Sequence, residues 1–384
     1  MQKARPMNLD RLFEPVSIGG LSLANRLVMA PMTRHFSPGG VPSREVAGYY
    51  ARRARNDVGL IITEGVAVDH AAAVDYDDVP DLHNPAALSA WRGVVDEVHA
   101  AGGKIIPQLW HQGPLRNAAI SNSPSLFGVR PSGIWGPEDG TVSLDPDLVR
   151  RQLVPSRPAT DSEIQDIIDS FARSARNAIG VGFDGIALHG AHGYLIDCFL
   201  WKETNKRRDR WGGVSAARAE FAAAVVRAIR AEIGADRPII FRFSQFKMQD
   251  YRAVLAETPM ELEALLGPIA QAGVDVFDGS QRFFDQPTFE CMSLNLAGWA
   301  KRLTGKASMT VGGVGVSRPH GDTRKERSLV SRDNLDRLMP RLDRGEFDLV
   351  GVGRALANDP EWARKIRCGE SPTDFDQANM QILT

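Results

Sequence analysis

Cysteine is scarce in this sequence, and long apolar runs are missing. The 384 residues include three cysteines, Cys198, Cys291 and Cys368, which lie far apart and form no Cys-x-x-Cys pair. This spacing argues against a disulfide framework and against a cysteine-bound metal cluster. The chain contains no apolar run of roughly 18 residues, and the stretch Met1–Pro6 has no apolar core of the kind found in signal peptides. We therefore expect a cytoplasmic protein that does not enter a membrane.

An excess of charge of either sign is also absent. Lysine and arginine together number 46, aspartate and glutamate 47, and the formal net charge is -1. Because no long basic block occurs, neither a nucleic acid nor an anionic membrane is indicated as a partner. A small molecule is the expected ligand. The sequence leaves the oligomeric state open, a homo-oligomer included.

What the chain does have is a repeating unit, in which a short apolar stretch alternates with a helical pattern. The pattern predicts strands at 26–30, 58–63, 104–110, 183–188, 238–243, 274–277, 307–311 and 347–352. It predicts helices after the N-cap Ser43, at 84–101, after the capping box Thr160–Glu163, at 215–233 and at 260–272.

This alternation predicts the fold class. Strands and helices that alternate along a chain favour an α/β fold with a parallel sheet, and eight such units favour a closed (β/α)8 TIM barrel. Before the first unit, Val16–Leu23 alternates apolar and polar residues around Gly19-Gly20, which predicts an N-terminal β-hairpin. We expect a single barrel domain over residues 1–384.

Two long segments interrupt the repeat. After the third strand, residues 113–159 are rich in Pro, Gly and Ser, and a segment this long is more often a lid over the active face than an idle loop, although a disordered excursion stays open. Residues 318–330, which are polar and basic, form a second insertion after the seventh strand.

The fourth strand is followed at once by three chemically active side chains. The sequence after it reads His189-Gly-Ala-His192-Gly-Tyr194. In α/β barrels, ligands bind at the carboxyl ends of the strands. A single histidine there could cap a loop, and a tyrosine could pack into the core, but two imidazoles and a phenol within six residues indicate a functional site.

The other strand ends carry groups that suit a flat, phosphorylated ligand. Gly312-Gly313 and Gly353-Arg354 follow the seventh and eighth strands, the usual phosphate site of this fold. Thr33, the Gly65 backbone, Gln108 and Arg242 offer hydrogen bonds to a heteroatom-rich ring. Arg242 lies in an apolar strand, where it needs either a structural ion pair or a ligand whose negative charge it stabilises.

Metal and Schiff-base chemistry have less support. The two histidines are three residues apart, and the strand ends carry few carboxylates besides Glu64, Asp278 and Asp285. A Schiff-base lysine belongs in a strand near the carboxyl end, whereas Lys104 begins one. Lys247, which follows the fifth strand, stays open as such a lysine.

Together, five motifs at these strand ends resemble the Old Yellow Enzyme family of FMN-dependent ene-reductases. The resemblance extends from Leu12 to Trp362, and its motifs are NRLVMAPMTR at 25–34, QLWH at 108–111, HGAHGYL at 189–195, TNKRRDRWGG at 204–213 and GVGR at 351–354. It implies one non-covalent FMN and NADH or NADPH as the reductant.

The resemblance also implies roles for individual residues. The residues that match contacts to the flavin ring are Pro31, Met32, Thr33, Gly65, Gln108 and Arg242, and those that match the phosphate site are Gly312, Gly313, Gly353 and Arg354. His189 and His192 match the pair that donates hydrogen bonds to the substrate oxygen. Tyr194 matches the proton donor.

The implied reaction is reduction of the C=C bond of an α,β-unsaturated carbonyl or a related activated alkene, by hydride transfer from reduced FMN and protonation by Tyr194. An FMN-dependent amine dehydrogenase or demethylase is the alternative enzyme, and a non-catalytic flavin-binding protein is the alternative of another class. Residues 113–159 and 283–292 match no family pattern residue by residue. The physiological alkene and the choice between NADH and NADPH therefore stay open.

Overall fold

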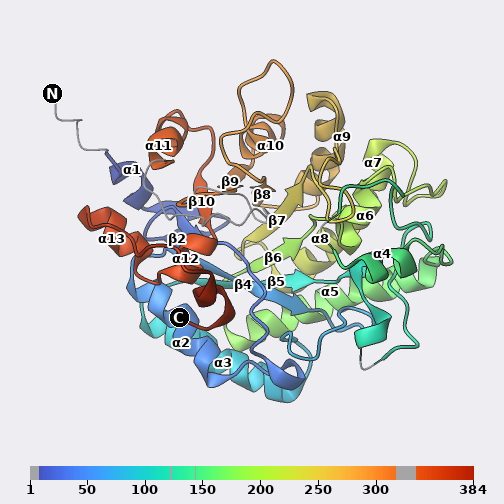
Figure 1. Ribbon diagram of the computed structural model, residues 1–384, viewed down its shortest axis with the longest axis horizontal. Coiled ribbons are helices and arrows are strands. Elements are labelled where there is room, and N and C mark those ends of the chain that lie inside the picture. The colour runs from blue at the N-terminus through green and yellow to red at the C-terminus, as the bar shows by residue number, and fades with distance from the viewer. Residues whose placement is uncertain (1–7, 122, 143, 317–333) are drawn as a thin grey trace.

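Eight parallel strands close into a barrel at the centre of the molecule, and helices surround it (Figure 1). The computed structural model describes residues 8–121, 123–142, 144–316 and 334–384, so the expected insertion at 318–330 lies outside the described residues. Neighbouring strands follow the order β10-β3-β4-β5-β6-β7-β8-β9. They are β3 (Leu27–Met29), β4 (Leu60–Ala67), β5 (Ile105–Trp110), β6 (Ile186–His189), β7 (Ile239–Ser244), β8 (Val276–Ser280), β9 (Ala307–Val311) and β10 (Leu349–Val352). The predicted TIM barrel is confirmed.

The helices follow the strands in the alternation that the sequence predicts. They are α1 (Asp10–Phe13), α2 (Arg44–Arg55), α3 (Pro85–Ala100), α4 (Pro146–Gln152), α5 (Asp161–Val181), α6 (Leu195–Leu200), α7 (Ser215–Arg218), α8 (Glu220–Ile233), α9 (Pro259–Gln271), α10 (Leu296–Thr304), α11 (Leu335–Asp343), α12 (Arg354–Asn358) and α13 (Trp362–Cys368). Thr160 and Glu163 form the predicted capping box at the start of α5.

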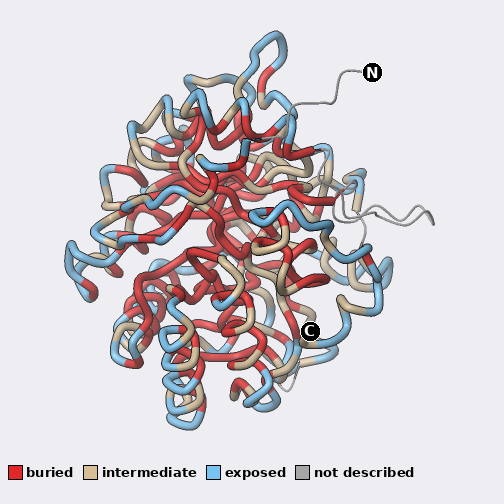
Figure 2. The backbone as a smooth tube through the Cα atoms, turned by 90° about the vertical axis from the view of Figure 1, so that its left-hand side faces the viewer, coloured by how far each residue is buried: buried red, intermediate tan, exposed pale blue. Residues whose placement is uncertain are grey.

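Two layers of apolar side chains build the core. Strand residues that alternate outward pack against the helices, and those that alternate inward fill the barrel with a small cluster that includes Val28, Ile106 and Ile240. The predicted hairpin is present as β1 (Val16–Ile18) and β2 (Leu21–Leu23). Its Ile18 and Leu23 join the inner cluster, so the hairpin closes the amino end of the barrel. Figure 2 shows buried backbone through the middle of the molecule and exposed backbone around the rim.

The 113–159 insertion contains the short helix α4 and is tied to the loops after three strands. Arg116 Nε donates to the Val74 carbonyl after β4, and Arg207 Nη1, after β6, donates to the Pro131 carbonyl. The amide of Tyr251, after β7, donates to the Thr141 carbonyl over 2.9 Å. Since these loops all follow carboxyl ends of strands, the insertion lies at the end of the barrel where the site is expected.

Several predicted boundaries are wrong. The strand predicted to end at residue 63 continues as β4 through Glu64 and Gly65 to Ala67. The pairing between β4 and β5 shifts in register between Ile62 and Gly65 and then resumes, which extends the strand. The helix predicted at 215–233 is divided into α7 and α8, and the side chain of Ser43 makes no capping hydrogen bond to α2. β6 begins at Ile186 and includes His189, and β8 runs to Ser280.

Candidate active site

A layer of polar side chains lies directly above the apolar side chains that fill the barrel. Ile106, Ala187, Ile240 and Val276 point inward. Because side chains of a strand alternate between its two faces, the residue two positions later shares the same face. Those residues are Gln108, His189, Arg242 and Asp278, all of them buried. The register aligns His189 with Arg242 and Arg242 with Asp278 on neighbouring strands, so the layer is continuous around this side of the barrel.

Arg242 forms an ion pair and still has an unused donor. Its Nε lies 2.5 Å from Oδ2 of Asp278, with both side chains buried. Burial raises the pKa of the Asp278 carboxyl, and the neighbouring guanidinium opposes that shift. Nη2 of Arg242 is buried with no hydrogen-bond partner among the described residues. The structural ion pair left open by the sequence is therefore present, and it leaves the Nη2 amino group of Arg242 for a ligand.

His189, His192 and Tyr194 gather beside this layer. The ring centroids of His189 and His192 are 5.1 Å apart, and those of His189 and Tyr194 are 4.6 Å apart. The indole of Trp110 packs edge-to-face against Tyr194 at 5.1 Å and stacks with His189 at 6.4 Å. The structure thus brings together the three side chains that the sequence singled out.

Three contacts fix the orientation of His192. Its Nε2 lies 2.9 Å from the hydroxyl of Ser280, and its backbone amide donates to the hydroxyl of Ser244. Phe246 stacks on the imidazole at a centroid distance of 5.0 Å. The backbone of His192 has a φ of 63°, a left-handed conformation that non-glycine residues adopt at some energetic cost. The surrounding loops must therefore hold this turn in place.

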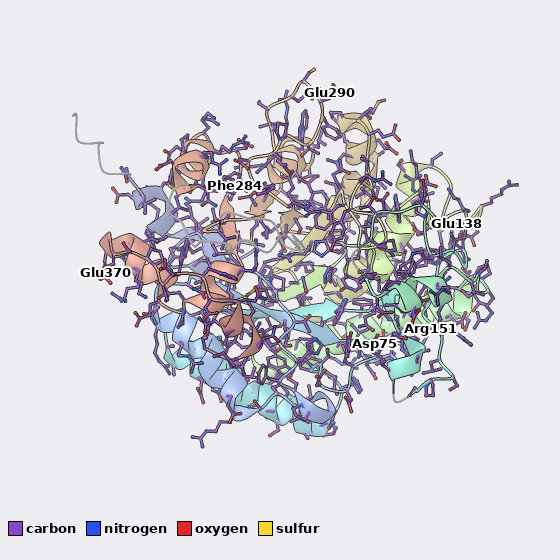
Figure 3. The ribbon with its side chains drawn as sticks, in the orientation of Figure 1. Asp75, Glu138, Arg151, Phe284, Glu290 and Glu370 are labelled. Carbon is purple, nitrogen blue, oxygen red and sulfur yellow. The ribbon has the colours of Figure 1, made fainter. Side chains whose placement is uncertain are left out.

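Burial sets the protonation states of the cluster. Desolvation, and then the charge of Arg242, hold the pKa of His189 well below its usual range, so the imidazole is neutral at physiological pH. Desolvation also raises the pKa of Tyr194, which keeps the phenol protonated, and the carboxylate of Asp75 acts in the same direction. Figure 3 labels Asp75 on the side of the barrel where α4 lies.

The ring-binding residues expected from the sequence lie along one arc of the barrel. Gly65 pairs with Gln108 across β4 and β5, and a Cβ at Gly65 would lie 2.6 Å from Cε3 of Trp110. Thr33 lies four residues after the end of β3 and is half-buried, as are Pro31 and Met32. The backbone there is held by Glu64, whose Oε2 accepts the amide of Arg34 over 2.8 Å. Burial raises the pKa of Glu64 to about 7.

The expected phosphate residues lie at the ends of β9 and β10. Gly312 and Gly313 have φ values of 149° and 67°, which only glycine adopts without strain. Gly353 precedes α12 and lies close to the segment after β3: a Cβ there would be 3.5 Å from Sδ of Met32. Arg354 is the first residue of α12. Backbone amides that have no side chain above them form an accessible cradle for an anion.

These features fit FMN. Nη2 of Arg242 is buried with no partner among the described residues, an expensive arrangement unless a ligand completes it. A flavin ring presents carbonyl and nitrogen acceptors, and its phosphate suits a glycine cradle. No group of three or more His, Cys, Asp or Glu residues able to hold a metal ion occurs in the described chain.

Comparison with known proteins assigns the family. The model of the NADH:flavin oxidoreductase / NADH oxidase family matches residues 11–290. The chain belongs to this family. Its members are FMN-dependent enzymes that use NAD(P)H, so the enzyme class and cofactors expected from the sequence are those of the family.

Curated relatives match over part of their length. Chanoclavine-I aldehyde reductase fgaOx3 of Penicillium roqueforti is 38% identical over 237 residues, 62% of this chain and 60% of the relative. 12-Oxophytodienoate reductase 7 of Oryza sativa is 40% identical over 234 residues, 59% of this chain and 56% of the relative. The NADH oxidase of Thermoanaerobacter brockii is 32% identical over 368 residues, 94% of this chain and 51% of that protein. The match thus spans about half to three-fifths of these relatives.

Solved structures extend the likeness to nearly the whole chain. The Old Yellow Enzyme homologue of Zymomonas mobilis is 25% identical with a TM-score of 0.78, covering 97% of each chain. Morphinone reductase in complex with tetrahydroNAD is 27% identical with a TM-score of 0.78, covering 96% of this chain and 93% of that one. The resemblance to Old Yellow Enzymes seen in the sequence is therefore confirmed. In the described chain, no helix has the length and apolarity that crossing a bilayer requires.

Sequence reasoning did not find the partners of the site residues. Asp278 was noted as a strand-end carboxylate but not as the partner of Arg242, and Ser280 was not identified as the partner of His192. The sequence also gave no indication that residues after β7 hold the turn at 192–194 in place. Lys247, left open as a Schiff-base lysine, is fully buried and paired with Asp197 at 2.7 Å. Its position after a strand was the one available signal.

Proposed function

We propose that this enzyme reduces the C=C bond of an α,β-unsaturated carbonyl or a related activated alkene. The observation that carries the proposal is the cluster of His189, His192 and Tyr194. The ring centroid of His189 lies 5.1 Å from that of His192 and 4.6 Å from that of Tyr194, and His189 pairs with Arg242 on the next strand. Two imidazoles and a protonated phenol at one spot suit a substrate in which an oxygen gains charge while a carbon gains a proton.

The proposal assigns the cofactor to the polar layer and the glycine cradle. Thr33, Gly65, Gln108 and Arg242 would hold the flavin ring, with the backbone of Pro31 and Met32 beside it. The phosphate would lie at Gly312, Gly313, Gly353 and Arg354. When bound, reduced FMN supplies the hydride for the β-carbon of the alkene. Arg242, with its free Nη2, provides positive charge next to the ring.

The remaining chemistry belongs to the side chains of the cluster. His189 and His192 donate N–H hydrogen bonds to the carbonyl oxygen of the substrate and stabilise the negative charge that grows there. Tyr194 delivers its phenolic proton to the α-carbon. Neighbouring groups fix both imidazoles. His189 lies in its strand and stacks with Trp110, whereas His192 contacts Ser280 and Phe246. Little reorganisation is therefore needed during the reaction.

The first expected result concerns the cofactor. Heat should release a flavin with the mass of FMN, because the phosphate site proposed after β9 and β10 would hold a single phosphate at the top of the barrel. Mass spectrometry of the supernatant measures it. Release of FAD, or a colourless protein that FMN does not reconstitute, would contradict the assignment.

A second expected result concerns the histidine pair. The double variant His189→Ala, His192→Ala should bind enones and phenols more weakly, by roughly tenfold to a hundredfold for each lost hydrogen bond to charge, on the order of 1.5–3 kcal/mol. Titration of the flavin absorbance with a phenol measures the affinity. FMN content serves as the control and should not change, since the ring and phosphate contacts lie on other residues. Unchanged phenol affinity would count against the assignment.

A further inference from the structure

A fully buried ion pair lies behind the catalytic turn. Nζ of Lys247, after β7, is 2.7 Å from Oδ1 of Asp197 in α6, and both side chains are 0% exposed. No other salt bridge within the described ranges has both partners at 0% exposure. Nζ also donates to the carbonyl of Ser244 over 2.9 Å. Burying two charges costs desolvation that their attraction does not reliably repay, so such a pair is weak evidence for stability alone.

The second oxygen of Asp197 connects the pair to the turn. Oδ2 accepts the backbone amide of Gly193 over 2.7 Å, and Gly193 lies between the two site residues His192 and Tyr194. His192 and Gly193 both have left-handed backbones, with φ values of 63° and 82°. Glycine adopts this conformation without strain, but His192 does so at an energetic cost, so the turn needs external contacts to stay in place.

The segment that carries the lysine holds the same turn from its other side. The carbonyl of His192 accepts the amide of Met248 over 3.1 Å, and the carbonyl of Gly193 accepts Nε2 of Gln249 over 2.9 Å. A Cβ at Gly193 would collide with the Gln249 side chain, so the packing is tight. The ion pair therefore locks residues 247–249 onto α6, with the 192–193 turn clamped between them.

We propose that Asp197 and Lys247 are positioning residues for His192 and Tyr194, a role that rests on the proposed function of these two. Neither touches the reacting atoms. The carboxylate fixes the Gly193 amide, and the ammonium fixes the carboxylate. A turn that shifts by about 1 Å would move the imidazole and the phenol away from the substrate, and misplacement on that scale costs up to about a hundredfold in rate.

The decisive variant replaces the charges by apolar side chains of similar volume. Asp197→Leu, Lys247→Met should fold and unfold at a denaturant concentration close to that of the wild type. The apolar pair avoids the desolvation cost of the two charges, which offsets the loss of the hydrogen bonds to the Gly193 amide and the Ser244 carbonyl. It should keep its FMN. Its reoxidation by an enone should be about 10- to 100-fold slower in stopped-flow measurements, while reoxidation by O2 stays unchanged. Hydrogen exchange of the peptide that contains Gly193 should be faster.

A second lysine–aspartate pair, at the opposite end of the barrel, serves as a control with the same kinds of hydrogen bond but less burial, its side chains being 33% and 24% exposed. Lys301 Nζ lies 2.8 Å from Oδ1 of Asp348 and donates to the Gly345 carbonyl, and Oδ2 of Asp348 accepts the amide of Ser308 over 3.0 Å. The same double change there, Lys301→Met, Asp348→Leu, should leave the enone rate unaltered. Equal slowing in both double variants would mean a general effect and would overturn the proposal, as would an enone rate at the wild-type level, or lost FMN, in the Asp197/Lys247 variant.

A conservative pair of variants tests the idea if the apolar pair does not fold. Asp197→Asn keeps an oxygen that accepts the Gly193 amide, whereas Asp197→Ala does not, so the Asn variant should retain several-fold more of the enone rate. Equal rates would overturn the role of this hydrogen bond. If the wild type itself reduces no enone, the proposed function fails, and hydrogen exchange at Gly193 still reports on the positioning. Unchanged exchange in the variants then overturns the positioning role separately.

Discussion

Replacing Tyr194 by Phe should slow the reoxidation of the reduced enzyme by an enone by about 10²–10⁴-fold, the usual contribution of general acid catalysis. The change removes one oxygen. The ring should keep its packing against Trp110 and His189, whose centroids lie 5.1 and 4.6 Å away. The raised pKa of Tyr194 means that the wild-type phenol holds its proton until it is used. Stopped-flow absorbance with cyclohexenone as the oxidant measures the rate.

Two other rates serve as controls for Tyr194→Phe. Reduction of the enzyme by NADH or NADPH transfers no proton from Tyr194, and reoxidation by O2 or a quinone protonates no carbon, so both should stay near the wild-type values. If the variant instead loses the reductive half-reaction, or consumes cyclohexenone at the wild-type rate, Tyr194 is not the acid. The proton would then come from water or from a residue of the 113–159 insertion.

Arg242→Met should have the largest effect on stability and also weaken FMN binding. It leaves the carboxylate of Asp278, 1% exposed at its side chain, without its partner 2.5 Å away. Breaking a buried pair in this way costs about 3–5 kcal/mol in the free energy of unfolding. The lost hydrogen bond from Nη2 to the flavin should add roughly tenfold to a hundredfold in the dissociation constant of FMN. Denaturant unfolding of the flavin-free protein and fluorescence titration with FMN measure the two effects.

A second change separates these two effects. In Arg242→Met, Asp278→Leu the unpaired carboxylate is gone, so stability should recover most of the loss while FMN affinity stays low. Asp278→Asn, which keeps the guanidinium, should bind FMN more tightly than either. Recovery of FMN affinity together with stability would show that Arg242 acts only as a structural cation. The flavin-binding role proposed for it would then be wrong.

Local patterns were sufficient for the barrel and for the neighbourhood of the site. The alternation of apolar and polar residues along a strand shows which side chains share a face. Eight strands that alternate with helices permit few topologies other than a closed parallel barrel. Because active sites of this fold lie at the carboxyl ends, the strand-end residues His189, Tyr194 and Arg242 could be found without any knowledge of contacts. The hairpin around Gly19-Gly20 could also be predicted, because the pattern that indicates it lies within eight consecutive residues.

The structure of segments without a regular hydrophobic period could not be predicted in this way. The 113–159 insertion follows neither a helical nor a strand period, and its position is set by distant contacts such as Arg116 with Val74 and Tyr251 with Thr141. The end of β4 was misplaced because a register shift, which depends on pairing with β5, carries the strand past Glu64. Residues 113–159 and 283–292 also match no family pattern residue by residue, so the sequence did not indicate the substrate.

The sequence by itself determined which residues stand at the strand ends and therefore which chemistry is available. Only the tertiary structure decided which of them are paired. Arg242 meets Asp278 across 36 residues, Lys247 meets Asp197 across 50, and His192 meets Ser280 across 88. Each pair joins side chains from different strands, loops or helices, and no local propensity specifies such a partner. The closure of the barrel brings them within hydrogen-bonding distance, and burial makes pairing energetically necessary for the two ion pairs.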